Sequence, residues 1–211
     1  MIKQSFKNID FRILWGAGCM TGIARAMEFL ALSLFALQEL GLPYLVTIIF
    51  AARMLPMSLL GIVIGTISER ISPISVIKYI YTLSNISTGI AILLFFTNHF
   101  NVIFAFLLAF INGITWVVDL AVRRRVLADN IDQNLLSSSL AMETLSNNAT
   151  RLIGPLCAGS LYAFVGLVGI FSVQLFMYII ALGFIIKFQR SKKHNIKPSK
   201  ENFETTMKKH W

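Results

Sequence analysis

Long apolar runs separated by short polar turns form the dominant pattern along this chain. The hydrocarbon core of a bilayer is about 30 Å thick and takes about 20 mostly apolar residues per helical crossing. Each run reaches about that length. We therefore expect six transmembrane helices, over residues 13–37, 44–67, 73–96, 102–122, 140–165 and 167–186. The pattern predicts an all-α integral membrane protein.

Turn-forming and charged residues indicate several of these boundaries. Pro73 stands at the expected start of the third helix, where its missing N–H costs no hydrogen bond. Gly166 leaves room for only a minimal turn between the fifth and sixth helices. The triplet Arg123–Arg125 follows the fourth helix and is expected to anchor its end, before a polar and partly helical surface segment over 126–139.

The two ends of the chain differ from its centre in composition. Residues 1–12 carry basic side chains ahead of the first apolar run, which is too long for a secretory signal peptide and is expected to be retained. Residues 187–211 are charged and poor in apolar side chains, which is typical of a solvated segment without a fold of its own. The expected organisation is a cytoplasmic N-terminus over 1–12, a transmembrane domain over 13–186 and a basic cytoplasmic tail over 187–211.

Composition and charge agree with the helix pattern. Hydrophobic residues make up 56% of the chain and mean hydropathy is +0.71, which leaves too little polar surface to cover a water-soluble globule. The net charge of +9 would also fit a nucleic-acid-binding protein, but the basic residues flank the expected spans on one side. By the positive-inside rule, both termini then lie in the cytoplasm. The partner of the basic flanks is the lipid bilayer, with no nucleic acid, and we expect a multi-pass protein of the plasma (inner) membrane.

Charged residues interrupt the apolar runs near their middle. They are Arg25 and Glu28 in the first helix, Arg53 in the second and Arg151 in the fifth. A charge at the bilayer centre costs on the order of 3 kcal/mol, so these side chains are expected to face an interior cavity. The structural alternative is that Arg25 and Glu28 neutralise each other within the bundle.

Helical spacing places further polar residues beside these charges, because residues three or four apart lie on one side of a helix. The stripes are Gly18, Gly22, Arg25 and Glu28 in the first helix, Asn112, Trp116 and Asp119 in the fourth, and Glu143, Asn147 and Arg151 in the fifth. The third and sixth helices carry only modest polar groups such as Asn85 and Gln174. We expect helices one, two, four and five to line a wet path that handles substrate and protons, although Trp116 fits ordinary core packing equally well.

The end of the second helix carries a short motif. Gly61 and Gly65 lie four residues apart, and Glu69 and Arg70 follow at the helix exit. This segment resembles the G-x-x-x-D/E-R loop signature of the major facilitator superfamily of transporters. The resemblance implies a gating loop of these four residues, with Asp119 as a further member. If the family resemblance is set aside, the two glycines are interpreted as packing contacts, and Glu69 and Arg70 as an ion pair at the helix end.

Two further segments carry the same resemblance. Residues 11–15, FRILW, are similar to the F-R-x-L-W start of the branch that contains the enterobactin exporter and macrolide efflux proteins, and residues 151–159 are similar to its R-x-x-G-P-x-x-x-G segment. The second match implies a bend of helix five at Gly154, Pro155 and Gly159, where Pro155 alone would be a tolerated kink. The family implies an N-terminal six-helix half bundle in which helices one, two, four and five face the translocation path.

The chain departs from the family pattern in two places. After Arg70 the next basic residue is Lys78, so the loop carries fewer positive charges than is usual in the family. The sequence also stops after six expected spans where family members have twelve. We expect a half or truncated transporter whose tail resembles the start of the central linker. The partners that this implies are a small-molecule substrate and a second six-helix half, either a separate chain or a second copy.

Together these features predict a secondary-active transporter that exports a small amphiphilic molecule, such as a drug or a siderophore, by proton-coupled alternating access. Glu28, held beside Arg25, is expected to change protonation during the cycle, and the arginines at 25, 53 and 151 favour an anionic substrate. The chain contains no phosphate-binding loop of the form G-x-x-x-x-G-K-S/T, and Cys19 and Cys157 stand apart in apolar helices. We expect no enzymatic activity, no cofactor and no metal.

Three other functions fit the sequence. A half-transporter that acts only as a dimer would form a discrete species of double mass. The membrane subunit of an ATP-driven exporter also has six spans, but it usually carries long cytoplasmic helical extensions, whereas the loops here are short. A non-transporting remnant or membrane scaffold would show no transport phenotype.

Overall fold

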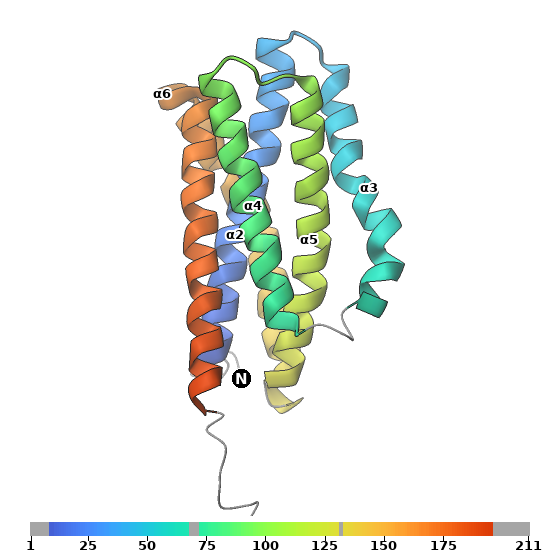
Figure 1. Ribbon diagram of the computed structural model, residues 1–211, viewed down its shortest axis with the longest axis vertical. Coiled ribbons are helices and arrows are strands. Elements are labelled where there is room, and N and C mark those ends of the chain that lie inside the picture. Colours follow the sequence, from blue (N-terminus) through green and yellow to red (C-terminus); the bar gives the residue numbers. More distant parts are fainter. Residues whose placement is uncertain (1–8, 68–71, 131–132, 196–211) are drawn as a thin grey trace, which may run out of the picture.

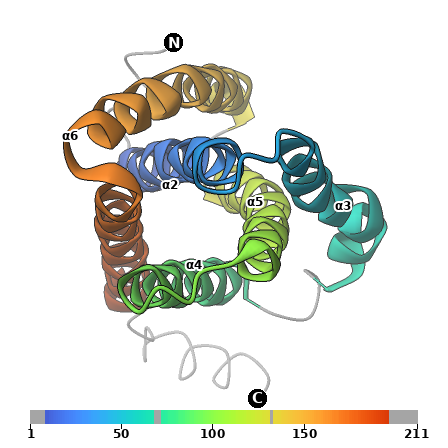
Figure 2. The ribbon, with the colours of Figure 1, turned by 90° about the horizontal axis from the view of Figure 1, so that it is seen from above.

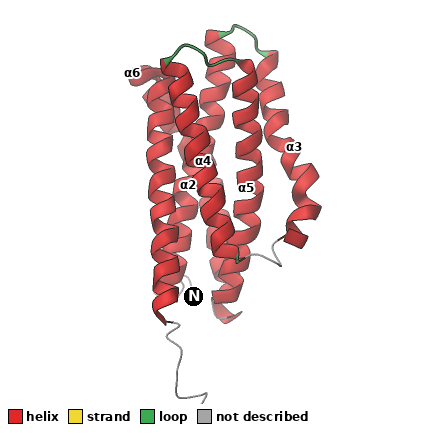
Figure 3. Cartoon of the chain, in the orientation of Figure 1, coloured by secondary structure: helices red, strands yellow, loops and turns green. Residues whose placement is uncertain are grey.

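A bundle of long helices makes up the computed structural model, which describes residues 9–67, 72–130 and 133–195. No strand occurs in these residues (Figures 1 and 3). The α-helices are α2 (Ile9–Leu34), α3 (Tyr44–Ile67), α4 (Pro73–Phe96), α5 (Val102–Asn130) and α6 (Gln133–Asn195), and the π-helix η1 (Phe35–Glu39) continues α2. The predicted all-α fold is confirmed. The predicted bounds of the second and third helices, 44–67 and 73–96, match α3 and α4.

The predicted end of the fourth helix, at residue 122, is wrong. Helix α5 continues to Asn130, so Arg123–Arg125 lie inside a helix rather than at its end. Ion pairs one turn apart support this extension, from Arg123 to Asp119 at 3.6 Å and from Arg125 to Asp129 at 3.9 Å. Arg123 is buried, which a residue anchoring a helix end in the headgroup layer would not be.

Helix α6 consists of two arms that meet at Gly166. This residue has φ 65° and ψ −164° inside an otherwise helical run, a combination that is open almost only to glycine. Figure 2 shows the two arms, 133–165 and 167–195, as separate columns of the bundle. The predicted turn at Gly166 is confirmed.

The expected count of six separate helices is not confirmed. The described residues form five α-helices, because the two arms of α6 are one continuous assigned helix. Four stretches in the described residues are long and apolar enough to cross a membrane: Ile9–Gln38, Pro73–Phe96, Val102–Asp129 and Leu135–Gln189, the last containing both arms. The stretch Tyr44–Leu59 of α3 is a shorter apolar helix.

Two apolar clusters close the two ends of the bundle. One contains Phe35 and Phe171, packed with the rings of Phe95 and Phe100, and the other contains Phe11, Tyr81 and Phe188 among its buried members. Eight of the buried polar residues lie in sequence between the parts of α2, α4, α5 and the second arm of α6 that join these clusters. They are Thr21 and Arg25, Ser84 and Thr88, Asn112, Thr115 and Asp119, and Gln174. A polar layer therefore crosses the middle of the bundle, where the bilayer centre would lie.

The outer face is apolar. Large hydrophobic side chains such as Phe96, Leu152, Leu156 and Phe164 are each at least 70% exposed. An exterior of this kind is unfavourable in water and suits contact with lipid tails. The polar layer inside and the apolar face outside are the arrangement of a multi-pass membrane protein.

Candidate functional site

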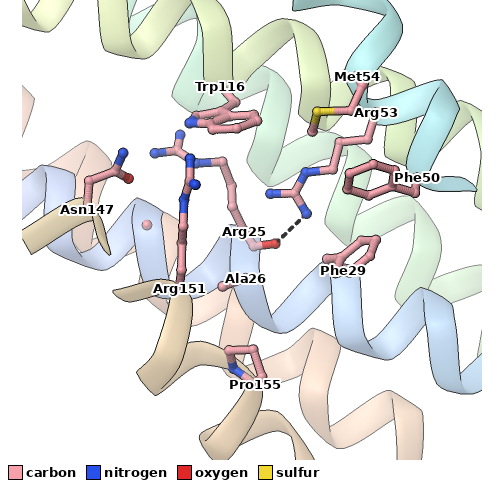
Figure 4. Close-up of a pocket in the computed structure, with 11 residues that line it drawn as sticks. Arg25, Ala26, Phe29, Phe50, Arg53, Met54, Trp116, Asn147, Arg151 and Pro155 are labelled. Atoms are coloured by element: carbon pink, nitrogen blue, oxygen red, sulfur yellow. Dashed lines mark hydrogen bonds between the residues drawn. The ribbon is translucent and has the colours of Figure 1, made fainter. Parts of the chain in front are cut away.

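A cavity of about 300 Å³ opens beside the polar layer (Figure 4). It is lined by Gly22, Arg25, Ala26, Phe29, Phe50, Arg53, Met54, Trp116, Asn147, Arg151 and Pro155. These residues come from α2, α3, α5 and the first arm of α6. These correspond to helices one, two, four and five, which the sequence predicted to line a wet path, and neither α4 nor the second arm of α6 contributes to this lining. That the cavity handles substrate and protons stays a prediction.

Arg25 forms an ion pair with α5 rather than with its own helix. Its Nη2 donates to Asp119 Oδ2 at 2.9 Å and to Thr21 Oγ1 at 3.1 Å. Asp119 also accepts a hydrogen bond from the Tyr81 hydroxyl at 2.8 Å, and both Arg25 and Asp119 are buried. The alternative in which Arg25 and Glu28 neutralise each other is not what the structure shows, because Asp119 is the carboxylate with which Arg25 forms its ion pair.

The ion pair of Arg25 and Asp119 extends into a longer buried chain of charges. Arg123 lies 3.6 Å from Asp119 and 3.1 Å from Glu143, and exposed Arg124 lies 3.6 Å from Glu143. Arg25, Asp119, Arg123 and Glu143 alternate in sign, so this group of four, which we call the charge chain, is neutral as a whole. It connects α2, α5 and the first arm of α6. Glu143, predicted to lie on the path, faces this chain and does not line the cavity.

Glu28 also lies outside the cavity. It is buried and faces the second arm of α6, where the Gln174 side-chain amide donates to Glu28 Oε2 and also to Thr88 Oγ1 at 3.3 Å. Within the described residues, the other Glu28 oxygen, both polar side-chain atoms of Asn112 and the Tyr178 hydroxyl have no hydrogen-bond partner. We call these five side chains, at 28, 88, 112, 174 and 178, the Glu28 cluster.

The sequence stripes missed three of the five residues in this cluster. Thr88 and Tyr178 lie on the third and sixth expected helices, which were assigned a supporting role, and Gln174 was noted only as a modest polar group. A glutamine inside an apolar span is the signal that could have indicated the cluster, because an unpaired amide is costly in the bilayer core. The sequence offers no comparable signal for Thr88, whose hydroxyl can bond within its own helix.

Two cavity arginines lack an acidic partner. In the part of the chain that the structure describes, neither Arg53 nor Arg151 has a carboxylate within 4 Å. Arg53 donates from Nη1 to the Arg25 carbonyl oxygen at 3.1 Å. Its guanidinium carbon lies 5.4 Å from the Phe29 ring centre and 5.5 Å from that of Trp116, and the guanidinium carbon of Arg151 lies 5.1 Å from the same Trp116 ring. Both arginines therefore approach one indole (Figure 4).

Glycines let the helices that line the cavity approach closely. A Cβ atom at Gly22 would lie 2.6 Å from Thr150 Oγ1 on the first arm of α6. A Cβ at Gly154 would meet the Ala26 side chain, and one at Gly18 would meet the Arg123 guanidinium. Gly154 thus serves close packing of α2 on α6, while Pro155 lines the cavity and Gly159 has only an ordinary contact, 3.9 Å to Leu30.

The predicted gating loop falls mostly outside the described structure. Glu69 and Arg70 lie outside the described residues. Gly61 and Gly65 belong to α3, and Asp119 belongs to the charge chain. The gating role of these residues stays a prediction.

The comparisons with known proteins give one family. Residues 4–211 match the protein-family model described as "Transmembrane secretion effector". No curated protein and no solved structure matches the chain.

Proposed function

Because the chain belongs to the transmembrane secretion effector family, within the major facilitator superfamily, we propose that this membrane transporter exports a small amphiphilic molecule by proton-coupled alternating access. The two arms of α6 act as the fifth and sixth of six transmembrane segments. The match covers nearly the whole chain, so the assignment applies to the bundle and its cavity together.

The cavity is the observation that carries the proposal. It combines apolar and aromatic walls, from Phe29, Phe50 and Trp116, with charged groups from Arg53 and Arg151. A volume of about 300 Å³ is at the small end of ligand pockets, which run from roughly 300 to 1,000 Å³. An amphiphile of modest size suits such walls. Drugs and siderophores are candidates within this class.

A second bundle completes the transporter in this proposal. The cavity borders the charge chain at Arg25, and Arg151 on its wall is exposed, which suits a path shared between two halves. A separate chain or a second copy of this chain would supply the other half. The segment Gly61–Arg70 would then form part of the gate between the halves.

Glu28 is the proton-carrying group in this proposal. The neutral Gln174 amide donates a hydrogen bond to it, and it forms no ion pair within the described residues. An intramembrane carboxyl group without a permanent counter-ion is a typical element of a proton relay. Glu28 is separate from the cavity residues, so coupling would pass through α2, which carries both Arg25 and Glu28.

A transport assay tests the proposal. The full chain, reconstituted alone and with a second bundle into liposomes with an imposed proton gradient, should drive an amphiphilic fluorescent dye across the membrane. Glu28→Gln should abolish the proton-driven component and leave dye exchange down its own gradient. Asp129→Asn, which removes an exposed carboxylate, is the control and should transport normally. Undiminished proton-driven transport by Glu28→Gln would exclude the coupling role, and absence of all dye movement would favour a scaffold or remnant.

A further inference from the structure

The charges around the cavity do not balance. The charge chain neutralises Arg25 internally, because Arg25 is paired with Asp119 at 2.9 Å and Arg123 with Glu143 at 3.1 Å. Arg53 and Arg151 remain, and no aspartate or glutamate lines the cavity. The wall therefore carries two arginines that form no ion pair within the described residues, although Glu28, outside the lining, interacts electrostatically with Arg53.

Arg53 and Arg151 also have N–H donors that are available for a ligand. Arg53 uses Nη1 on the Arg25 carbonyl, but its Nε is buried and has no hydrogen-bond partner among the described residues. Arg151 is exposed and touches Trp116 through its guanidinium. A guanidinium has five N–H donors in a planar fork that fits carboxylate, sulfonate and phosphate groups, so both side chains retain donors for such a group.

The guanidinium groups of Arg53 and Arg151 both lie near the ring of Trp116. Both lie within 5.5 Å of its ring centre, and a cation near an indole face is attracted by the ring quadrupole. Figure 4 shows Arg53 and Arg151 reaching toward this ring from α3 and from the first arm of α6. The ring provides part of the attraction that an acidic residue would otherwise supply. It attracts both positive charges, while Arg53 Nε keeps no hydrogen-bond partner within the described residues.

We infer that the cavity selects anionic amphiphiles, whose carboxylate, sulfonate or phosphate group binds between Arg53 and Arg151 while an aromatic part packs against Phe29 and Phe50. This inference rests on the proposed function, since it names the substrate class of the same cavity. An anion would remove the cost of two unpaired charges near the bilayer centre. A cationic ligand would meet like charges and an indole that both arginines already approach.

Binding of three naphthalene probes to the purified full chain tests this inference. The probes are 2-naphthoate, 2-naphthalenemethanol and 2-naphthylmethylammonium, which share the ring system and differ in charge. Isothermal titration calorimetry in phosphatidylcholine nanodiscs should give an affinity for 2-naphthoate on the order of 10- to 100-fold above that for the alcohol, as expected for charge-assisted hydrogen bonds. The ammonium probe should bind weakest. Equal affinities for the three probes would overturn the inference.

Matched variants assign any preference to the two arginines. Arg53→Gln with Arg151→Gln should remove the preference for 2-naphthoate, while the corresponding Lys variants should keep most of it. Arg125→Gln removes one positive charge outside the cavity and should change nothing. Size-exclusion profiles and melting temperatures establish folding. If the double variant does not fold, Arg151→Gln alone must lower naphthoate affinity about tenfold, and an unchanged affinity would overturn the inference.

Binding and transport can fail separately. Arginine-dependent binding of 2-naphthoate without movement of any probe would support the anion site and contradict the transport proposal. Transport of all three probes at equal rates would support transport and contradict the anion site.

Discussion

Buried charges of alternating sign form a connected cluster that links three segments of the bundle. Asp119 is fully buried and serves Arg25, Arg123 and the Tyr81 hydroxyl at once. Buried charge pairs cost much of their attraction in desolvation, but removing one partner leaves the other charge uncompensated. Asp119 therefore contributes to stability mainly because its carboxylate compensates the buried positive charges of Arg25 and Arg123.

Asp119→Asn should destabilise the bundle by about 3–5 kcal/mol, the cost typical of breaking a buried ion pair. The amide keeps the size of the side chain but leaves Arg25 without a carboxylate and Arg123 with Glu143 alone. The free energy of unfolding, measured by detergent-induced denaturation, checks this. Asp129→Asn, at a residue whose side chain is 59% exposed, should stay within about 0.5 kcal/mol of the unaltered protein. Equal stabilities of the two variants would contradict a structural role for the charge chain.

The position of Glu28 illustrates what residue spacing can and cannot predict. The sequence places Gly22, Arg25 and Glu28 in steps of three, which suggests one face. At 3.6 residues per turn each such step falls about 60° short of a full turn, so Gly22 and Glu28 differ by about 120°. Gly22 and Arg25 therefore line the cavity, while Glu28 faces Gln174 on the second arm of α6. The helix that lies opposite that face is determined by tertiary packing, and residue spacing along one helix does not predict it.

At the scale of elements, the two arms of α6 depend on one backbone conformation. Gly166 adopts φ 65° and ψ −164°, and apart from its own local backbone and chain neighbours nothing lies within 4 Å of the position that a Cβ would occupy. A side chain at this position is therefore disfavoured by the backbone conformation and not by a steric clash.

Gly166→Ala should cost about 1–3 kcal/mol, because that region of φ and ψ is essentially reserved for glycine. Gly183 is a matched control on the second arm, since it also has open space around it but has no positive φ. Gly183→Ala should be neutral or stabilise by up to about 1 kcal/mol through helix propensity. Melting temperatures of both variants check the pair, and equal shifts would show that the backbone of Gly166 is not limiting.

Gly154 determines how closely α2 and the first arm of α6 pack. A side chain there would meet Ala26 and the α2 backbone at Ile23 and Met27, so Gly154→Val should cost about 1–3 kcal/mol by overpacking and should reduce the binding of cavity ligands. Gly159→Ala on the same arm is the control, since its nearest atom lies 3.9 Å away. Calorimetric binding of 2-naphthoate and melting temperatures report the two effects. Unchanged packing and binding in Gly154→Val would contradict this role.

Sequence patterns predicted the elements better than their interactions. The apolar lengths that span a bilayer predicted the bounds of α3 and α4 and the break at Gly166, because these depend on local composition and on one glycine. They failed at Arg123–Arg125, since the contact that buries Arg123 comes from Glu143 on another helix. The cavity walls were predicted because four helices carry polar groups in their middle. The charge pairing was not, because it depends on which helices are neighbours.

At the scale of the whole molecule, the bundle has two chemically different ends. Figure 1 shows α2 beginning and α6 ending at the same end of the bundle, while the turn between α4 and α5 lies at the other. Lys187 belongs to the last turns of α6, and the turn over residues 97–101, which contains Asn98 and His99, has no Lys or Arg. By the positive-inside rule, we predict that the first end faces the cytoplasm.

Single cysteines introduced in a background that lacks Cys19 and Cys157 should therefore differ in accessibility. His99→Cys, in an exposed turn, should react with a membrane-impermeant maleimide in intact cells, whereas Lys187→Cys should react only after the membrane is opened. The expected ratio of labelling is large because the reagent does not cross the bilayer, and denatured samples of both variants provide the full-labelling control. Labelling of Lys187→Cys in intact cells with protection of His99→Cys would reverse the orientation. The apolar exterior and the polar middle layer would still fit a membrane in that case, because neither depends on which end faces the cytoplasm.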